Sequence, residues 1–239
     1  MTKVAGQDAD DDHAWAERLG WAYGLTAPDA VDRAAALVRL DDARATVRRT
    51  RVHLNETRRL TAGLGHEEQD REPALLAARA AHDDALSRCL PEALWNRPFF
   101  ERISTWVGLP FALHFLEWEA RYPQEWTQHA KAWGTKEGLI RDLAADDHDE
   151  AVGTRLVDLV DLAVQRAYRC KDREYVRVAR AVDGDDLRDR LARAHHSDNP
   201  WARLHAGYVL WLLDHPETPN TRHVWRTWLA DEMTNASPG

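Results

Sequence analysis

The most apolar stretch of the chain, residues 99–118, constrains the fold most strongly because it combines helical spacing with one interruption. Its first half repeats apolar residues at the three- and four-residue intervals of one helical face. These residues are Phe99, Ile103, Trp106 and Val107. Gly108 and Pro110 suit the end of one helix and the first turn of the next. The second half is apolar on nearly all sides, which is typical of a buried helix. The stretch predicts two short helices with a bend at the centre of the fold.

The N-terminal part of the chain continues the helical spacing. A long helix is expected from residue 26 to about residue 63. From Ala36 to Leu64, small and apolar residues recur in alternating steps of four and three, which is the heptad pattern of packed helices. We expect Thr26 to be the N-cap of this long helix. The same pattern returns over residues 73–90, after a charged loop with two glycines. Matching seams joined by a short loop predict an antiparallel helical hairpin.

Residues 175–182 would suit a strand by composition, but their spacing and flanking arginines favour a short helix. No other segment shows a convincing alternation of apolar and polar residues, so the sequence predicts an all-α protein. Residues 1–12 are rich in aspartate and are expected to form a disordered acidic leader. The hairpin then covers residues 13–95, and a multi-helix bundle covers residues 96–233. The chain has 11 tryptophans, which fall largely into two clusters. We expect these clusters to belong to the core. The alternative is that part of them forms an exposed binding surface.

Composition narrows the range of functions. The formal net charge of −8 argues against sequence-independent binding to nucleic acid, which requires a basic surface. No apolar run is long enough to span a membrane, and the first residues lack the apolar core of a signal peptide. The two cysteines, Cys89 and Cys170, form no disulfide framework, which fits a reducing, cytoplasmic setting.

Near the C-terminus, the segment Asn199-Pro-Trp-Ala-Arg203 is followed by Ala206 and Leu210. This segment resembles the turn and second helix of a HEAT-type helical repeat, and the resemblance extends over residues 185–231. It implies a pair of packed helices. HEAT units stack such pairs into curved scaffolds that bind other proteins. A HEAT-like pair is therefore expected to complete the bundle.

Two sets of residues are candidates for metal binding. Asp185, Asp186 and Asp189 fit a DDxxD pattern, which resembles the aspartate-rich motif with which isoprenoid synthases hold Mg²⁺ and a diphosphate. The alternative is that these carboxylates mark the start of a helix, where negative charge is favourable. His114 and Glu117 share a helical face at the spacing used in helical carboxylate metal sites. The alternative for His114 is a buried histidine that is hydrogen-bonded to a carboxylate or a carbonyl.

The sequence favours a non-enzymatic helical module that interacts with another protein or regulates it, with no cofactor. We expect the contact surfaces to include basic groups of the HEAT-like pair and of the long N-terminal helix. The residues concerned are Arg203, His205, Arg222 and Arg226 in the pair, and Arg48 and Arg51 in the helix. One alternative is a metal-dependent helical enzyme that uses the residues named above. A second is a nucleic-acid-binding regulator, and a homodimer is also left open.

Overall fold

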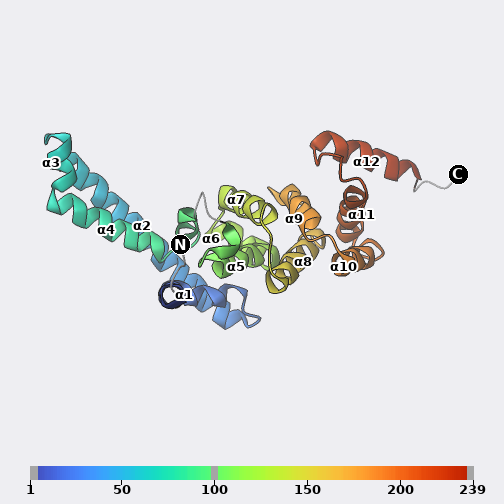
Figure 1. Cartoon of the computed structure of the whole chain (residues 1–239), viewed down its shortest axis with the longest axis horizontal. Coiled ribbons are helices and arrows are strands. Elements are labelled where there is room, and N and C mark those ends of the chain that lie inside the picture. The colour runs from blue at the N-terminus through green and yellow to red at the C-terminus, as the bar shows by residue number, and fades with distance from the viewer. Residues whose placement is uncertain (1–4, 98–101, 236–239) are drawn as a thin grey trace. The chain divides into compact units, whose positions relative to one another are not determined.

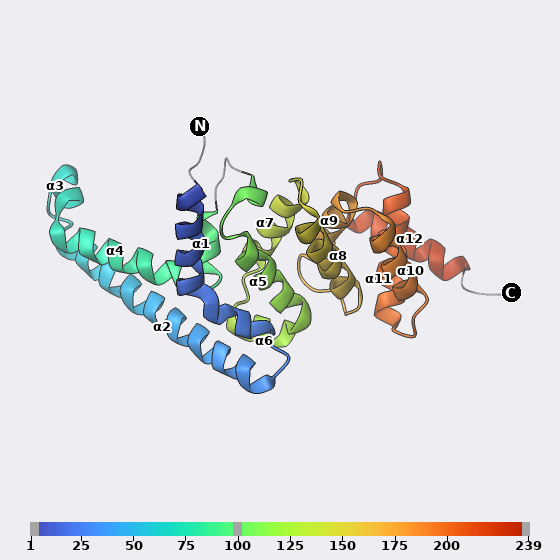
Figure 2. The same cartoon turned by 60° about the horizontal axis from the view of Figure 1, so that its bottom comes forward.

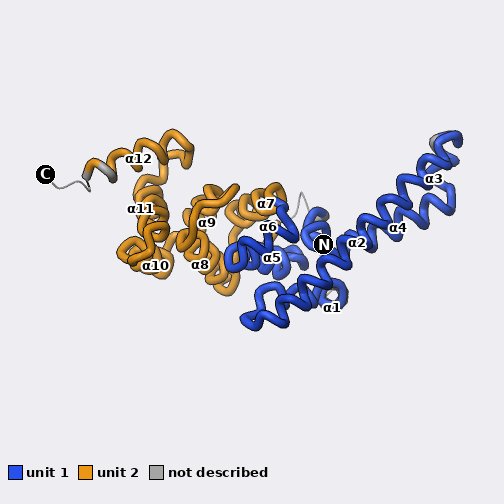
Figure 3. Tube along the Cα trace, turned by 180° about the vertical axis from the view of Figure 1, so that it is seen from behind, with its two compact units in different colours: residues 1–101, 105–132 blue, residues 102–104, 133–239 orange. Residues whose placement is uncertain are grey.

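The computed structural model describes residues 5–97 and 102–235, and over these residues the chain is helical and contains no strand (Figure 1). The all-α class is therefore confirmed. Packing divides the chain into two compact units, shown in different colours in Figure 3. Unit 1 contains residues 1–101 and 105–132, and unit 2 contains residues 102–104 and 133–239. The division into 13–95 and 96–233 stays a prediction about folding domains.

Unit 1 begins with helix α1 (Ala5–Leu19), which is followed by a short 3₁₀ helix, η1 (Gly20–Thr26). Helix α1 thus starts within the segment for which the sequence predicts a disordered leader. That leader stays a prediction about the chain in solution, and residues 1–4 lie outside the described residues.

Helix α2 (Ala30–Leu60) is capped by Asp29, and the expectation that Thr26 caps it is wrong. The Asp29 carboxylate accepts hydrogen bonds from the backbone N–H groups of Val31 at 2.7 Å and Asp32 at 3.1 Å. Thr26 lies in η1 instead. The proline at position 28 disfavours helical geometry in Ala27, the residue directly before it, so α2 cannot extend back to Thr26. The helix therefore starts only after this proline.

Helix α2 packs against α4 (Pro73–Ser87), and α3 (His66–Arg71) lies between them in the chain. Figures 1 and 2 both show α2 and α4 side by side. Leu54, Leu75 and Ala78 form a buried cluster between the two helices. Thr50 Oγ1 and His82 Nδ1 lie 3.0 Å apart and add a polar link across the same seam. The small residues of the seam allow this close approach.

Helix α5 (Leu109–Arg121) is almost entirely buried, as the apolar second half of the central stretch predicts. The first half is different, because residues 103–105 form only a single turn of 3₁₀ helix, η3 (Ile103–Thr105). The backbone N–H of Ser104 donates to Asp146 Oδ2 at 2.8 Å, so this group is not available for a hydrogen bond within a longer helix. Phe99, the first member of the expected helical face, lies outside the described residues.

Unit 1 is completed by helix α6 (Pro123–His129) and by a short 3₁₀ turn, η2 (Glu92–Asn96). Trp126 of α6 packs against Phe115 of α5, with ring centroids 5.6 Å apart. Trp118 and Trp126 are both fully buried. This part of the tryptophan-rich sequence therefore lies in the core.

Four of the helices in unit 2 pack as two consecutive pairs, and α7 packs on α9. Its elements are α7 (Trp133–Ala144), α8 (Glu150–Val164), η4 (Asp172–Glu174), α9 (Tyr175–Ala181), α10 (Asp185–His195), α11 (Pro200–Asp214) and α12 (Arg222–Asn235). Helix α8 packs on α9, and α10 packs on α11. The second pair packs on the first, because α10 contacts α8 while α11 contacts both α8 and α9. Two layers of stacked helices result.

A single arginine links α9 to the end of α11 and to the loop before α12. Arg180 Nη2 donates to the carbonyl oxygens of Leu212 at 3.2 Å, His215 at 3.3 Å and Thr218 at 2.7 Å. These carbonyls lie at and beyond the C-terminus of α11, where backbone acceptors lack helical partners. The arginine therefore positions the loop that leads into α12.

Gly108 provides a test of packing in unit 1. A Cβ atom at this position would lie 2.3 Å from the nearest atom of the Trp106 ring, and that ring packs edge-on against Trp15. We expect Gly108→Ala to lower the free energy of unfolding by about 1–3 kcal/mol, because the ring must be displaced. A methyl group added at Gly20 would meet nothing within 4 Å, so Gly20→Ala is the control. Urea denaturation measures both, and equal unfolding midpoints for the two variants would contradict the packing argument.

Candidate functional site in unit 2

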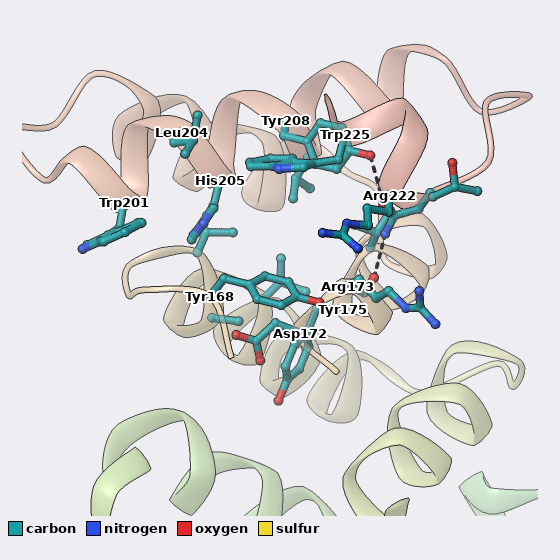
Figure 4. A pocket seen from close by; sticks show the side chains of 17 residues that line it. Tyr168, Asp172, Arg173, Tyr175, Trp201, Leu204, His205, Tyr208, Arg222 and Trp225 are labelled. Carbon is teal, nitrogen blue, oxygen red and sulfur yellow. Dashed lines mark hydrogen bonds between the residues drawn. The ribbon is translucent and has the colours of Figure 1, made fainter. Parts of the chain in front are cut away.

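A pocket of about 470 Å³ lies in unit 2 (Figure 4). Helices α8 and α9 and the segment between them form one side, and α11 with the start of α12 forms the other. The volume is within the range of sites that receive a small molecule. The aromatic residues that line it are Tyr168, Tyr175, Trp201, His205, Tyr208 and Trp225. The pocket is therefore mainly a surface for apolar or aromatic groups.

The wall on α11 follows from the way in which this helix begins. Asn199 accepts a hydrogen bond from the backbone N–H of Trp201 at 3.1 Å, and its amide donates to the carbonyl oxygen of Gln165 at 2.6 Å. The start of α11 is thereby held against the end of α8. Trp201, His205 and Tyr208 follow at intervals of four and three residues, so they share one face of the helix. That face lines the pocket.

The wall at the start of α12 is joined to the rest by a chain of hydrogen bonds. The Tyr208 hydroxyl donates to Asn220 Oδ1 at 3.0 Å, and Asn220 Nδ2 donates to the carbonyl oxygen of Arg173 at 2.8 Å. Burial raises the pKa of Tyr208 to about 12, so the hydroxyl keeps its proton at neutral pH and remains a donor. Trp225 meets the Tyr208 ring edge-on, with ring centroids 4.7 Å apart.

The Asp172 carboxylate lines the pocket but is already fully engaged within the protein. It accepts hydrogen bonds from Lys136 Nζ at 2.6 Å, Arg166 Nη1 at 2.7 Å and the backbone N–H of Arg169 at 2.7 Å. Lys136 is completely buried. Buried charges require such pairing because their transfer out of water is costly. Asp172 therefore adds no uncompensated negative charge to the site.

His205 lies in the middle of the α11 wall, between Trp201 and Tyr208 (Figure 4). Its ring stacks on Trp201, with centroids 5.9 Å apart and an angle of 29° between the planes. Burial lowers the pKa of His205, although the negative charge of Asp172 acts in the opposite direction. The imidazole is therefore neutral near pH 7 and serves as part of an aromatic surface.

Two arginines give the α12 end of the pocket a positive character. Arg173 forms an ion pair with Glu174, with Nε and Oε1 3.2 Å apart. Arg222 has no ion-pair partner among the residues of the described ranges, and Figure 4 shows its guanidinium group pointing into the space between Trp225 and Tyr168. Trp201 and Tyr168 are respectively 48% and 57% exposed, so their rings remain accessible to a ligand.

The structure brings together two of the contact residues that the sequence predicted, His205 and Arg222. Arg203 and Arg226 are exposed on the same two helices but do not line the pocket. Arg48 and Arg51 are exposed on α2, which belongs to unit 1. Their role as contact residues stays a prediction.

Sequence reasoning missed most of the aromatic lining because it favoured a core position for the C-terminal tryptophans over an exposed binding surface. The side chains missed are Tyr168, Tyr175, Trp201, Tyr208 and Trp225. Of this set, Trp201 could have been found from the sequence, because it lies four residues before the predicted contact residue His205 and therefore on the same helical face. Tyr168 lies between helices, and no periodicity reveals that it faces the same space.

The candidate metal ligands do not gather into a site. Over the described residues, no group of three or more His, Cys, Asp and Glu side chains is placed to hold a metal ion. Asp185 and Asp186 lie in the first turn of α10, and Asp189 is exposed one turn further along. Asp186 pairs with Arg190, with Oδ1 and Nε 3.0 Å apart. The carboxylates thus mark a helix start, as the alternative interpretation holds.

The second metal candidate lies in unit 1. His114 is buried, and its Nε2 donates to the carbonyl oxygen of Ala22 at 2.8 Å. Glu117 forms an ion pair with Arg121 on the same helix, at 2.8 Å. His114 therefore has the carbonyl contact that the sequence offered as the alternative to metal ligation.

Comparison of the chain with models of protein families, with curated proteins and with solved structures found no match. Within the described ranges, no helix has both the length and the apolar character needed to cross a membrane. The site must therefore be interpreted from its own geometry.

The Asp172 network predicts a large effect of a single substitution. We expect Lys136→Met to lower the free energy of unfolding by about 3 kcal/mol, because one of the charges balancing a buried carboxylate is lost. The control is Arg71→Met in the exposed pair Arg71–Glu67, which should cost less than about 1 kcal/mol. Chemical denaturation measures both values. A cost for Lys136→Met as small as that of the control would contradict this role of the network.

His205 predicts a pH dependence of stability. Its pKa in the folded protein lies below the ordinary value of 6.5, so between these two values the unfolded chain binds more protons than the folded one. Stability should therefore fall as the pH drops through this window. We expect His205→Gln to reduce the difference between urea midpoints measured at about pH 7.5 and about pH 5.5. An unchanged difference would show that other groups cause the pH dependence.

Proposed function

We propose that this chain is a non-enzymatic helical module that binds another protein and that the unit 2 pocket receives an apolar side chain of that partner. The observation that carries the proposal is the pocket wall, in which accessible aromatic rings surround a space of about 470 Å³. Exposed aromatic groups around a pocket are typical of the energetically dominant positions in protein interfaces. Trp201 and Tyr168 are such groups in this chain.

The stacking of helix pairs in unit 2 also supports the proposal. The pairs α8–α9 and α10–α11 pack in two layers, and α10–α11 with α12 contains the segment that resembles a HEAT unit. Scaffolds of stacked helix pairs bind other proteins on their extended surfaces. The two cysteines are free, one buried and one exposed, which is consistent with a cytoplasmic module.

The chemistry of the pocket favours binding over catalysis. Asp172 is occupied by Lys136 and Arg166, and His205 is stacked on Trp201. The remaining wall is largely apolar and therefore gains free energy when it is covered. Complete burial of a leucine or phenylalanine side chain contributes about 1.5–3 kcal/mol. An anchor of this size, with contacts around the rim, is enough for a transient complex.

Selection of peptides from a displayed random library on the purified chain tests this function. We expect the selected peptides to share a large apolar residue and to bind about tenfold more weakly to Trp201→Ala, because the exposed ring is removed from the pocket. Trp95 in unit 1 is exposed to a similar degree, at 51%, so Trp95→Ala is the matched control. Fluorescence polarisation with labelled peptides measures each affinity.

Two results would contradict the proposal. One is the failure of the library to yield any peptide that binds. The other is equal affinity of the selected peptides for wild type and Trp201→Ala, while Trp95→Ala reduces binding.

A further inference from the structure

The pocket has two chemically different ends. Trp201 and Tyr168 offer exposed aromatic surface, whereas Arg222 and Arg173 lie toward the start of α12 (Figure 4). A ligand that fills the pocket must therefore match apolar surface over most of its length and positive charge at one end. This requirement is more specific than the presence of an apolar anchor.

The charge at the second end is not balanced within the pocket. Asp172, the acidic residue of the lining, is held by Lys136 and Arg166. Glu174 balances Arg173, and Arg141 and Arg177 also contact that same carboxylate. Arg222 is left with a guanidinium group that points into the pocket and has no ion-pair partner in the described part of the chain. This imbalance is local, since the whole chain carries a formal net charge of −8.

A guanidinium group binds a carboxylate through two parallel hydrogen bonds, and the exposed Arg222 is accessible to such a group. The α12 helix adds to the same preference, because Thr221 and Arg222 at its start line the pocket and the N-terminus of a helix favours negative charge. The site is thus complementary to a carboxylate attached to an apolar group.

We propose that the partner segment bound by this pocket carries an aspartate or glutamate next to its large apolar residue, and that Arg222 binds the acidic side chain. This inference rests on the proposed function, because it names the chemistry of the segment that the pocket receives. The apolar residue lies against Trp201 and Tyr168, and the carboxylate lies at the start of α12. Arg222 therefore determines which apolar segments are accepted.

The test uses a displayed library with one fixed tryptophan and random flanking residues, selected in parallel on wild type, Arg222→Gln and Arg226→Gln. Arg226 is exposed one turn further along α12 and does not line the pocket, so its variant controls for the loss of a positive charge from the same helix. We expect acidic residues to be enriched next to the tryptophan on wild type and on Arg226→Gln. This enrichment should disappear on Arg222→Gln.

Affinities of one selected peptide and of its Asp→Asn or Glu→Gln counterpart then measure the coupling. With wild type, the acidic peptide should bind about tenfold more tightly than its neutral counterpart, as expected for a charge-assisted hydrogen bond. With Arg222→Gln the two peptides should bind about equally. A double-mutant cycle of this kind isolates the interaction between the two groups.

The outcomes separate this inference from the function on which it rests. If peptides are selected but show no acidic preference, or if the preference persists on Arg222→Gln, the inference is wrong while the proposed function stands. If no peptide is selected, both are wrong. N-acetyl-tryptophan and its uncharged amide serve as competitors. If the free acid binds more tightly than every selected peptide, the pocket is a site for a small carboxylic acid, and the inference is overturned.

Discussion

The pocket in unit 2 depends on the way in which the protein holds one buried carboxylate. Asp172 lies in the segment between α8 and α9, and it receives hydrogen bonds from Lys136 on α7, from the Arg166 side chain and from the backbone of Arg169. The Lys136 contact joins this segment to α7, and the other two contacts lie within the segment itself. Because a buried charge without partners is strongly unfavourable, the segment has few alternative conformations. Tyr168 and Tyr175, on either side of this carboxylate, are thereby kept at the pocket wall.

Much of the fold could be predicted from the sequence because helical periodicity is a local property. The apolar second half of the central stretch predicts a buried helix, and α5 is that helix. The errors also have local causes. Thr26 and Asp29 both suit an N-cap, and the proline between them decides in favour of Asp29. In the central stretch, the expected first helix is only one 3₁₀ turn, in which the Ser104 backbone N–H donates to the Asp146 side chain.

The site could be predicted only in part, because it is assembled from separate helices. The sequence predicts His205 and Arg222 as basic contact groups on the last two helices, and both line the pocket. Nothing in the spacing of Tyr168 shows that its ring faces α11. The tryptophans illustrate the same limit. Trp118 is fully buried while Trp201 is 48% exposed, yet both occur in similar helical patterns. Periodicity identifies an apolar face but does not show whether another element covers it.

The pocket has both of its walls only while α12 is docked, so its structure depends on the local equilibrium between docked and detached α12. This helix is attached through Trp225 and Trp228, whose rings lie 4.7 Å and 5.1 Å from the ring of Tyr208. Segments held by few side chains open more readily than the whole protein unfolds. When α12 detaches, the stacked helix pairs remain, but Arg222 and Trp225 no longer line the pocket. The apparent affinity for any ligand that bridges both walls is therefore scaled by the fraction of molecules in which α12 is docked.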